Sequence, residues 1–124
     1  DSSGTKQFTK QLGGATLGTV SKGVAIDSSG NIFIGGYTGW GGLDGNVGIG
    51  WDDFVIVKYN SAGTKQWTKQ LGVASGMTWG YGIATDSSGN AFITGYTDTG
   101  LDGNTLTGTN DMFVTKYDSS GTKQ

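Results

Sequence analysis

The stretch at residues 82–97, GIATDSSGNAFITGYT, has a second copy at residues 23–38, GVAIDSSGNIFIGGYT. In each copy, one apolar run precedes Asp-Ser-Ser-Gly and another follows it. This pattern is typical of two antiparallel strands joined by a tight turn. The two copies start 59 residues apart. A repeat of this length indicates a stacked or radial array of supersecondary units.

Three further segments also occur twice. Residues 7–13 (QFTKQLG) match residues 66–72 (QWTKQLG), and residues 54–60 (FVIVKYN) match residues 112–118 (MFVTKYD). Residues 1–7 and 118–124 are both DSSGTKQ. The sequence therefore predicts one unit at residues 1–59, a second at residues 60–117, and the start of a third at residues 118–124.

The composition argues against several classes of function. The 124 residues include 25 Gly but no Pro, Cys, His, Glu or Arg, and the formal net charge is −2. Without His or Cys, the chain lacks a Ser-His-Asp triad, a Cys-His pair and a His ligand for a metal. The negative charge and the missing Arg argue against a nucleic-acid partner, and no apolar run approaches the roughly 20 residues of a membrane helix. We therefore expect a protein that is not an enzyme and assign it no catalytic or cofactor-binding residue.

The run at residues 5–12 alternates between apolar and polar side chains and predicts a half-buried strand with a wet face. One side of this strand carries Phe8, Lys10 and Leu12, and the other carries Gln7, Thr9 and Gln11. The second copy has Trp67 at the position of Phe8. We interpret this large aromatic side chain as a packing residue that is buried between repeats.

The other predicted strands include apolar runs without alternation, at residues 32–34, 54–57 and 112–114. Such a run is typical of a strand that is covered on both faces. Together with a short strand at residues 24–26 and a returning strand at residues 31–37, each unit offers four antiparallel strands, of which the polar one is outermost. An all-β fold of repeated four-stranded antiparallel sheets is typical of β-propeller blades. The alternative is an open stack of β-sheets.

These segments resemble a known family. DSSGTKQWTKQLG, GIATDSSGNAFITGYT and the FVxKYD-like pattern are similar to the bacterial repeat family often called the seven-bladed beta-propeller repeat, and both copies match. The resemblance implies a propeller fold, circularly permuted here with the outer strand at the N-terminus. It also implies secreted or cell-surface proteins with many repeats, and it carries over no catalytic residue.

Each unit has a long loop, at residues 39–52 and 98–110, and both loops contain Leu-Asp-Gly-Asn. Their oxygen-bearing side chains suit calcium, although the spacing does not match an EF-hand. These side chains are Asp44, Asn46, Asp52 and Asp53 in the first loop, and Asp98, Asp102, Asn104 and Asp111 in or beside the second. The favoured interpretation is that they form turns and cap backbone N–H groups.

Carbohydrate is the other ligand to consider, because aromatic side chains lie in or beside these loops. They are Trp40, Trp51, Trp79 and Tyr81. Trp40 and Trp79 have no aromatic equivalent in the other copy, so the sequence implies no repeated sugar site, and packing between blades is the favoured interpretation.

The best prediction of function is assembly. Strands covered on both faces require a neighbouring sheet on each side, and two units provide only one interface between themselves. We expect an extracellular or cell-surface protein whose repeats join head to tail, each lending its outer strand to its neighbour, to give a ring or an open filament. The partners are copies of the chain or adjoining repeats. The predicted strand and seam of this assembly comprise Phe8, Lys10 and Leu12 of one unit beside Phe113, Thr115 and Tyr117 of the next. An adhesin or a lectin-like, calcium-dependent binding module is the alternative.

Overall fold

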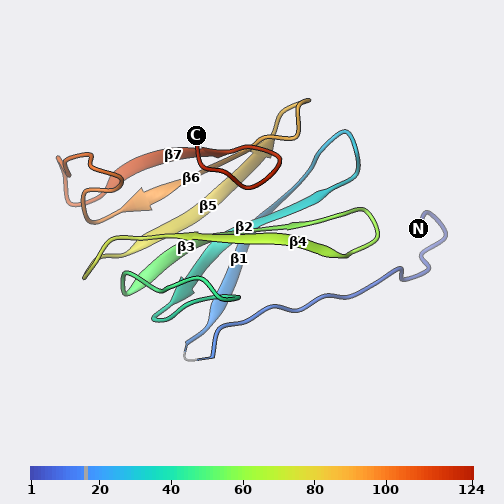
Figure 1. Cartoon of the computed structure of the whole chain (residues 1–124), viewed down its shortest axis with the longest axis horizontal. Helices are drawn as coiled ribbons and strands as arrows, with labels where there is room; N and C mark the ends of the chain where they lie inside the picture. The colour runs from blue at the N-terminus through green and yellow to red at the C-terminus, as the bar shows by residue number, and fades with distance from the viewer. Residues whose placement is uncertain (16) are drawn as a thin grey trace.

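The computed structural model describes residues 1–15 and 17–124, and within them all regular structure is β-strand. Two antiparallel sheets follow each other along the chain (Figure 1). The first sheet has the order β1-β2-β3-β4, with β1 at Thr19–Ile26, β2 at Ile32–Gly39, β3 at Asp52–Tyr59 and β4 at Lys65–Leu71. The second has the order β5-β6-β7, with β5 at Thr78–Thr85, β6 at Ala91–Thr97 and β7 at Asp111–Tyr117. The predicted all-β architecture of tandem antiparallel sheets is confirmed.

The predicted tight turns are present, and an Asx side chain organises each of them. In the turn between β1 and β2, a carboxylate oxygen of Asp27 accepts the backbone N–H of Ser29 and that of Asn31, both at 2.9 Å. Gly30 closes this turn with a φ of 78°, which a side chain would disfavour. Asn60 directs the turn between β3 and β4 in the same way, and Asp86 the turn between β5 and β6.

Both sheets carry a β-bulge in their first strand, opposite a glycine of the second strand. The bulges lie between Ser21 and Gly23 and between Gly80 and Gly82. A Cβ built on Gly36 would lie 1.9 Å from the carbonyl oxygen of Val20, so only glycine fits opposite the first bulge. The same close approach recurs at Gly95 in the second sheet.

Two of the predicted strands differ from the structure. The strand expected at residues 24–26 begins earlier, since β1 starts at Thr19. Residues 5–12 belong to neither sheet, so the strand predicted there is wrong for this chain alone. The physical reason is that a strand needs a hydrogen-bonded neighbour, and the equivalent strand β4 finds one in β3, which precedes it. In the part of the chain that the structure describes, no strand pairs with residues 5–12.

The sheets also cross the boundary between the sequence units. Strand β4 lies in the second unit, which starts at residue 60, yet it pairs with β3 of the first unit. One four-stranded sheet therefore runs across the boundary at 59/60.

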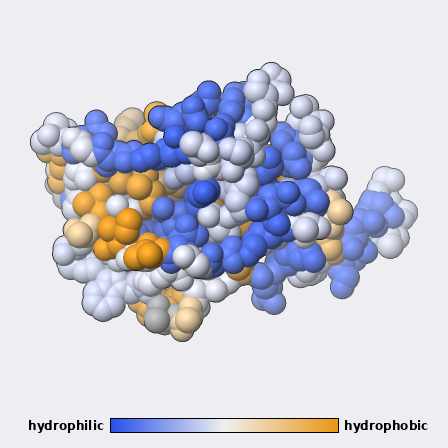
Figure 2. Space-filling model, in the orientation of Figure 1, coloured by the Kyte–Doolittle hydropathy of each residue, from blue (hydrophilic) through white to orange (hydrophobic). Residues whose placement is uncertain are grey.

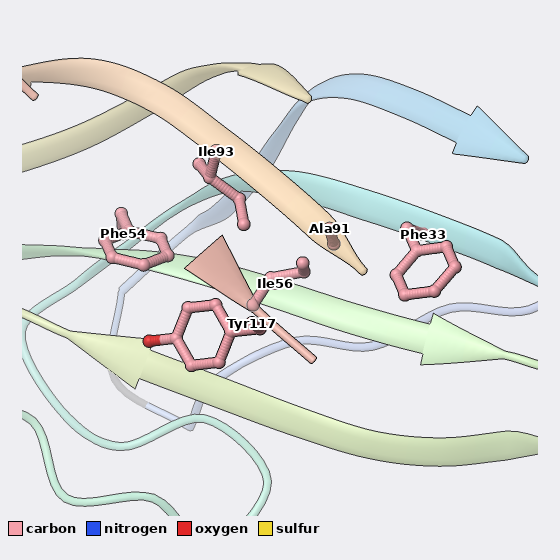
Figure 3. Close-up of a cluster of buried hydrophobic side chains, with 6 residues drawn as sticks. All are labelled: Phe33, Phe54, Ile56, Ala91, Ile93 and Tyr117. Carbon is pink, nitrogen blue, oxygen red and sulfur yellow. The ribbon is translucent and has the colours of Figure 1, made fainter. Parts of the chain in front are cut away.

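The core lies between the two sheets (Figure 3). Phe33, Phe54 and Ile56 of the first sheet point toward Ala91, Ile93 and Tyr117 of the second, and all six are buried. Trp67 of β4 is half-buried at the edge of this core, with its ring centroid 5.9 Å from that of Phe33 and 6.4 Å from that of Tyr117. The packing of Trp67 between the sheets is confirmed, but its side chain is half-buried and not buried as expected.

Candidate assembly faces

The two sheets have two outward apolar faces, one at each end of the stack. The distal face belongs to the second sheet and consists of Phe92, Met112, Val114 and Lys116. The register places these residues where the first sheet has Phe33, Phe54, Ile56 and Lys58. Phe54 and Ile56 are fully buried by the second sheet, whereas Met112 is 90% exposed and Val114 is 72% exposed.

The proximal face is the opposite side of the first sheet. Its residues are Val24, Ile26, Ile32, Ile34, Val55, Val57 and Tyr59, which the pairing puts on the side away from the core. Val24 and Ile26 are exposed, whereas Val55, Val57 and Tyr59 are buried. Residues 5–12 run along the outer part of this face (Figure 1), and between them and the sheet lies a cavity of about 370 Å³ lined by Lys10, Leu12, Val55 and Val57, among others.

The internal interface between the sheets shows how such faces join. The ammonium of Lys58 lies 5.1 Å from the centroid of the Phe33 ring and donates a hydrogen bond of 2.9 Å to the carbonyl oxygen of Ser119. On the distal face, Lys116 lies 5.3 Å from the centroid of the Phe92 ring. The same cation–aromatic pair is therefore already formed on the uncovered face.

The predicted seam residues are divided between the interior and the surface. Phe113 and Tyr117 point into the core of this chain, with ring centroids 5.5 and 6.2 Å from that of Phe54. Phe8 lies on the turn after β3, because a Cβ built on Gly63 would be 2.9 Å from its ring. Trp67 lies on Gly121 in the same way. The seam itself stays a prediction.

Sequence reasoning missed Met112 and Val114 as the exposed members of β7, with the half-buried Lys116 on the same face. Their signal was the alignment of MFVTKYD with FVIVKYN, but an apolar run without alternation does not show which side chains face which neighbour.

Each proposed calcium ligand in the first loop has a partner of its own. Asp44 forms an ion pair with Lys65 and accepts the Thr68 hydroxyl at 2.6 Å, which together hold the pKa of Asp44 below its usual value. Asp53 accepts the backbone N–H groups of Ile49 and Gly50, both at 2.8 Å. The partners of the other two are the Trp79 indole for Asp52 and the carbonyl oxygens of Leu43 and Thr68 for Asn46.

The second loop repeats this arrangement. Asp102 pairs with Lys123, Asn104 donates to the carbonyl oxygen of Leu101, and Asp111 accepts the N–H groups of Thr107 and Gly108. Asp98 accepts the N–H of Met77 at 2.7 Å. Among residues 1–15 and 17–124, no group of three or more acidic side chains could hold a metal ion. These contacts support the interpretation of the loops as turns with capped backbone groups.

The four aromatic candidates do not form one site. Trp79 packs edge-on against Tyr37 of the first sheet, with centroids 6.3 Å apart, so for Trp79 the packing interpretation is confirmed. Tyr81 stacks on Tyr96 at 5.5 Å. Trp40 and Trp51 instead remain 59% and 50% exposed and border a shallow hollow of about 690 Å³. The loops after β2, β4 and β6 lie on one side of the molecule in Figure 1. Figure 2, in the same orientation, shows apolar residues exposed on that side.

Comparison with protein families finds the same two repeats. A family model described as a beta-propeller repeat matches residues 7–40 and again residues 66–102. A search of curated proteins found no match. In the part of the chain that the structure describes, no helix is long and apolar enough to span a membrane.

Proposed function

Since the chain belongs to the beta-propeller repeat family, we propose that it is a non-enzymatic structural module whose repeats stack head to tail on further repeats of the same kind. The neighbouring repeats belong to other copies of the chain or adjoin it in one polypeptide. The proposal includes an extracellular or cell-surface location, where the stack forms a ring or a filament.

The observation that carries this proposal is the complementarity of the two outward faces. The distal face of the second sheet is equivalent to the side of the first sheet that packs in the core. The proximal face of the first sheet is equivalent to the side of the second sheet that packs in the core. A second copy can therefore repeat the internal interface, with its turn at residues 60–63 over Lys116 as the turn at residues 118–121 lies over Lys58.

The chemistry of the faces favours such a neighbour. Burying one large apolar side chain stabilises an interface by roughly 1.5–3 kcal/mol. The distal face offers Met112 at 90% exposure and Val114 at 72%. An interface between two different faces is heterologous, so it closes into a ring if the rotation per repeat divides a full turn and otherwise grows into a filament.

Light scattering over a range of concentrations tests the proposal. We expect the intact chain to associate, and Val114→Lys to shift it toward the monomer because a charge on the distal face would lose its hydration when covered. Val47→Lys is the matched control, since Val47 is exposed in the loop between β2 and β3 and belongs to neither face. A monomer at every concentration, with or without Val114→Lys, would contradict stacking between copies.

A second candidate function is binding of a neutral carbohydrate in the hollow beside Trp40 and Trp51. Among the described residues, the hollow is lined by apolar side chains, glycines and Ser75, and by no charged group. The second loop has threonine where the first has Val47, Ile49 and Trp51, and the two loops share the capping contacts of Asp53 and Asp111. The apolar side chains are thus not required for the loop conformation. Tryptophan fluorescence during titration with neutral oligosaccharides tests this candidate, with Trp51→Thr as the variant expected to lose the response.

A further inference from the structure

A cluster of aromatic side chains lies where the edge strands of the two sheets meet. Strands β1 and β5 are edge strands and contact each other across the interface between the sheets. The cluster comprises Lys22 of β1, Tyr37 of β2, Trp79 and Tyr81 of β5, and Tyr96 of β6, and we call it the edge cluster. It shares no member with the apolar core.

The contacts within the edge cluster form a closed circuit. Trp79 packs edge-on against two rings, with its centroid 6.3 Å from that of Tyr37 and 4.8 Å from that of Tyr96. Tyr96 stacks on Tyr81 at 5.5 Å, with 12° between the ring planes. The ammonium of Lys22 completes the circuit, because it lies 5.5 Å from the centroid of the Tyr37 ring and 5.5 Å from that of the Tyr81 ring. Rings from both sheets therefore hold one cation between them.

The cation in the cluster is weakly held. Among residues 1–15 and 17–124, the ion pairs are those of Lys65 and Lys123, so Lys22 has no carboxylate partner there. The side chain of Lys22 is exposed, and the contact of an exposed cation with a ring face is a weak interaction. Water can replace the rings around this ammonium, so another cation can displace Lys22 from the cluster.

Two carboxylates next to the rings favour a positive ligand. The indole N–H of Trp79 donates a hydrogen bond of 2.9 Å to Asp52, which fixes the orientation of the indole ring. Hydrogen bonding with Tyr81 and burial raise the pKa of Tyr96, and the negative charge of Asp98 adds to this effect. The phenol of Tyr96 therefore stays neutral at physiological pH, and both carboxylates contribute a negative potential that attracts cations.

The two repeats show that the rings on β5 are not needed for the shape of that strand. Trp79 and Tyr81 occupy the positions of Val20 and Lys22 in β1. Both strands carry their β-bulge at the same place and pair with the next strand in the same register. The second repeat thus has two aromatic side chains that the strand itself does not require, and both belong to the edge cluster.

We propose that the edge cluster is a binding site for a quaternary ammonium group, and that Lys22 occupies it until such a ligand displaces the lysine. Several aromatic rings around one cation are the usual means of recognising a quaternary ammonium ligand. Such an ion has no N–H group, so it gives up no hydrogen bond to water when rings surround it. Tyr81 is 44% exposed and forms the side from which the ligand enters. The cluster lies within one chain, so this inference does not depend on the proposed stacking.

Titration of the intact chain with choline, followed by tryptophan fluorescence, tests the site. We expect a saturable change from Trp79. The neutral isostere of choline, in which carbon replaces the nitrogen, should bind at least about tenfold more weakly because it lacks the charge that the rings attract. Equal responses to the two compounds would overturn the proposal. The response to choline should survive Trp51→Thr, which separates this site from the hollow beside Trp40 and Trp51.

Substitution of the lysine provides the sharpest test. Lys22→Met keeps the length of the side chain but removes its charge, so choline should bind about fivefold more tightly once its internal competitor is lost. Lys6→Met is the matched control, since Lys6 is exposed and lies outside both sheets. Equal effects of the two variants, or no response to choline in the Lys22→Met chain, would overturn the proposal.

Removal of one ring should abolish binding. Tyr81→Lys replaces the ring with a second cation, and the strand can accommodate it because Lys22 occupies the equivalent position in β1. The melting temperature of this variant verifies that it is folded. A folded Tyr81→Lys chain that binds choline as the parent does would contradict the proposed site.

Sedimentation with lipid vesicles identifies the source of the ammonium group. The vesicles contain either phosphatidylcholine or phosphatidylglycerol, and only the first lipid has a quaternary ammonium headgroup. Sedimentation with phosphatidylcholine alone, abolished by Tyr81→Lys, would support the site and assign it to a lipid headgroup. A response to free choline without sedimentation would support the site and assign it to a small soluble ligand.

Discussion

The indole N–H of Trp67 donates a hydrogen bond of 3.2 Å to the carbonyl oxygen of Ser119, across the interface between the two sheets. The same carbonyl oxygen accepts the ammonium of Lys58. The turn after β7 is thus held by two side chains from two neighbouring strands of the first sheet.

Replacing Trp67 with alanine should lower the free energy of unfolding by about 2–3 kcal/mol, below the ~3–5 kcal/mol typical of fully buried aromatic residues, because Trp67 is only half-buried. Chemical denaturation measures this change. Trp67→Phe is the control, since Phe8 occupies the equivalent position in the first copy, and it should cost clearly less. A Trp67→Ala chain as stable as the parent would contradict the packing role.

Acid should weaken the turns through their aspartates. Although burial opposes its charged form, hydrogen bonds from Asn31 and Ser29 and the charge of Lys58 lower the pKa of Asp27. A carboxylate with a lowered pKa stabilises the folded state above the unfolded pKa of about 3.9, and this contribution disappears as pH falls through the folded-state value.

Asp27→Asn removes this titration but retains the turn, because Asn60 forms the equivalent turn in the same chain. Unfolding followed from pH 7 to pH 2 should show a smaller loss of stability in acid for the variant than for the parent. Parallel curves for the two proteins would show that Asp27 does not contribute to the acid sensitivity.

Calcium should leave the melting temperature unchanged. The candidate carboxylates in both loops are engaged with lysine, threonine, tryptophan or backbone N–H groups. Melting curves with EDTA and with millimolar calcium should therefore coincide. A rise in the melting temperature that saturates with calcium would instead show linkage to a bound ion.

Gly36→Ala should destabilise the chain by more than an ordinary surface change, because the new Cβ would meet the Val20 carbonyl oxygen at 1.9 Å. The backbone must shift to relieve this contact, and we expect a loss of roughly 2–4 kcal/mol, in the upper range for point substitutions. Gly13→Ala is the control, since its Cβ would have no neighbour within 4 Å. Comparable stability of the two variants in thermal melts would argue against the bulge as the reason for the glycine.

Much of the fold was predictable because each element occurs twice in the sequence, so the two copies can be compared. The Asp-Ser-Ser-Gly turns and the strands around Phe33 and Phe54 follow from local rules of turns and apolar runs. The pairing of β4 with β3, in contrast, joins residues from two sequence units, and residues 5–12 show that an identical pattern does not make a strand without a neighbour.

The candidate site was predictable in kind but not in its residues. The need for a neighbouring sheet followed from the apolar runs. Only the register of β7, however, shows that Met112 and Val114 face outward while Phe113 faces the core. The contacts of Gln70 and Thr68 with the first loop depend on how that loop folds back over the sheet. Composition carries no information about that path.

The offset between sequence unit and sheet bears on how such a chain changes length in evolution. The second unit contributes three strands, β5 to β7, to one sheet and one strand, β4, to the sheet before it. Gain or loss of one whole unit by recombination therefore leaves every interior sheet with four strands, since the departing strand is replaced by its homologue from the next unit. Arrays of this kind can lengthen or shorten in single steps without passing through a chain that contains an incomplete interior blade.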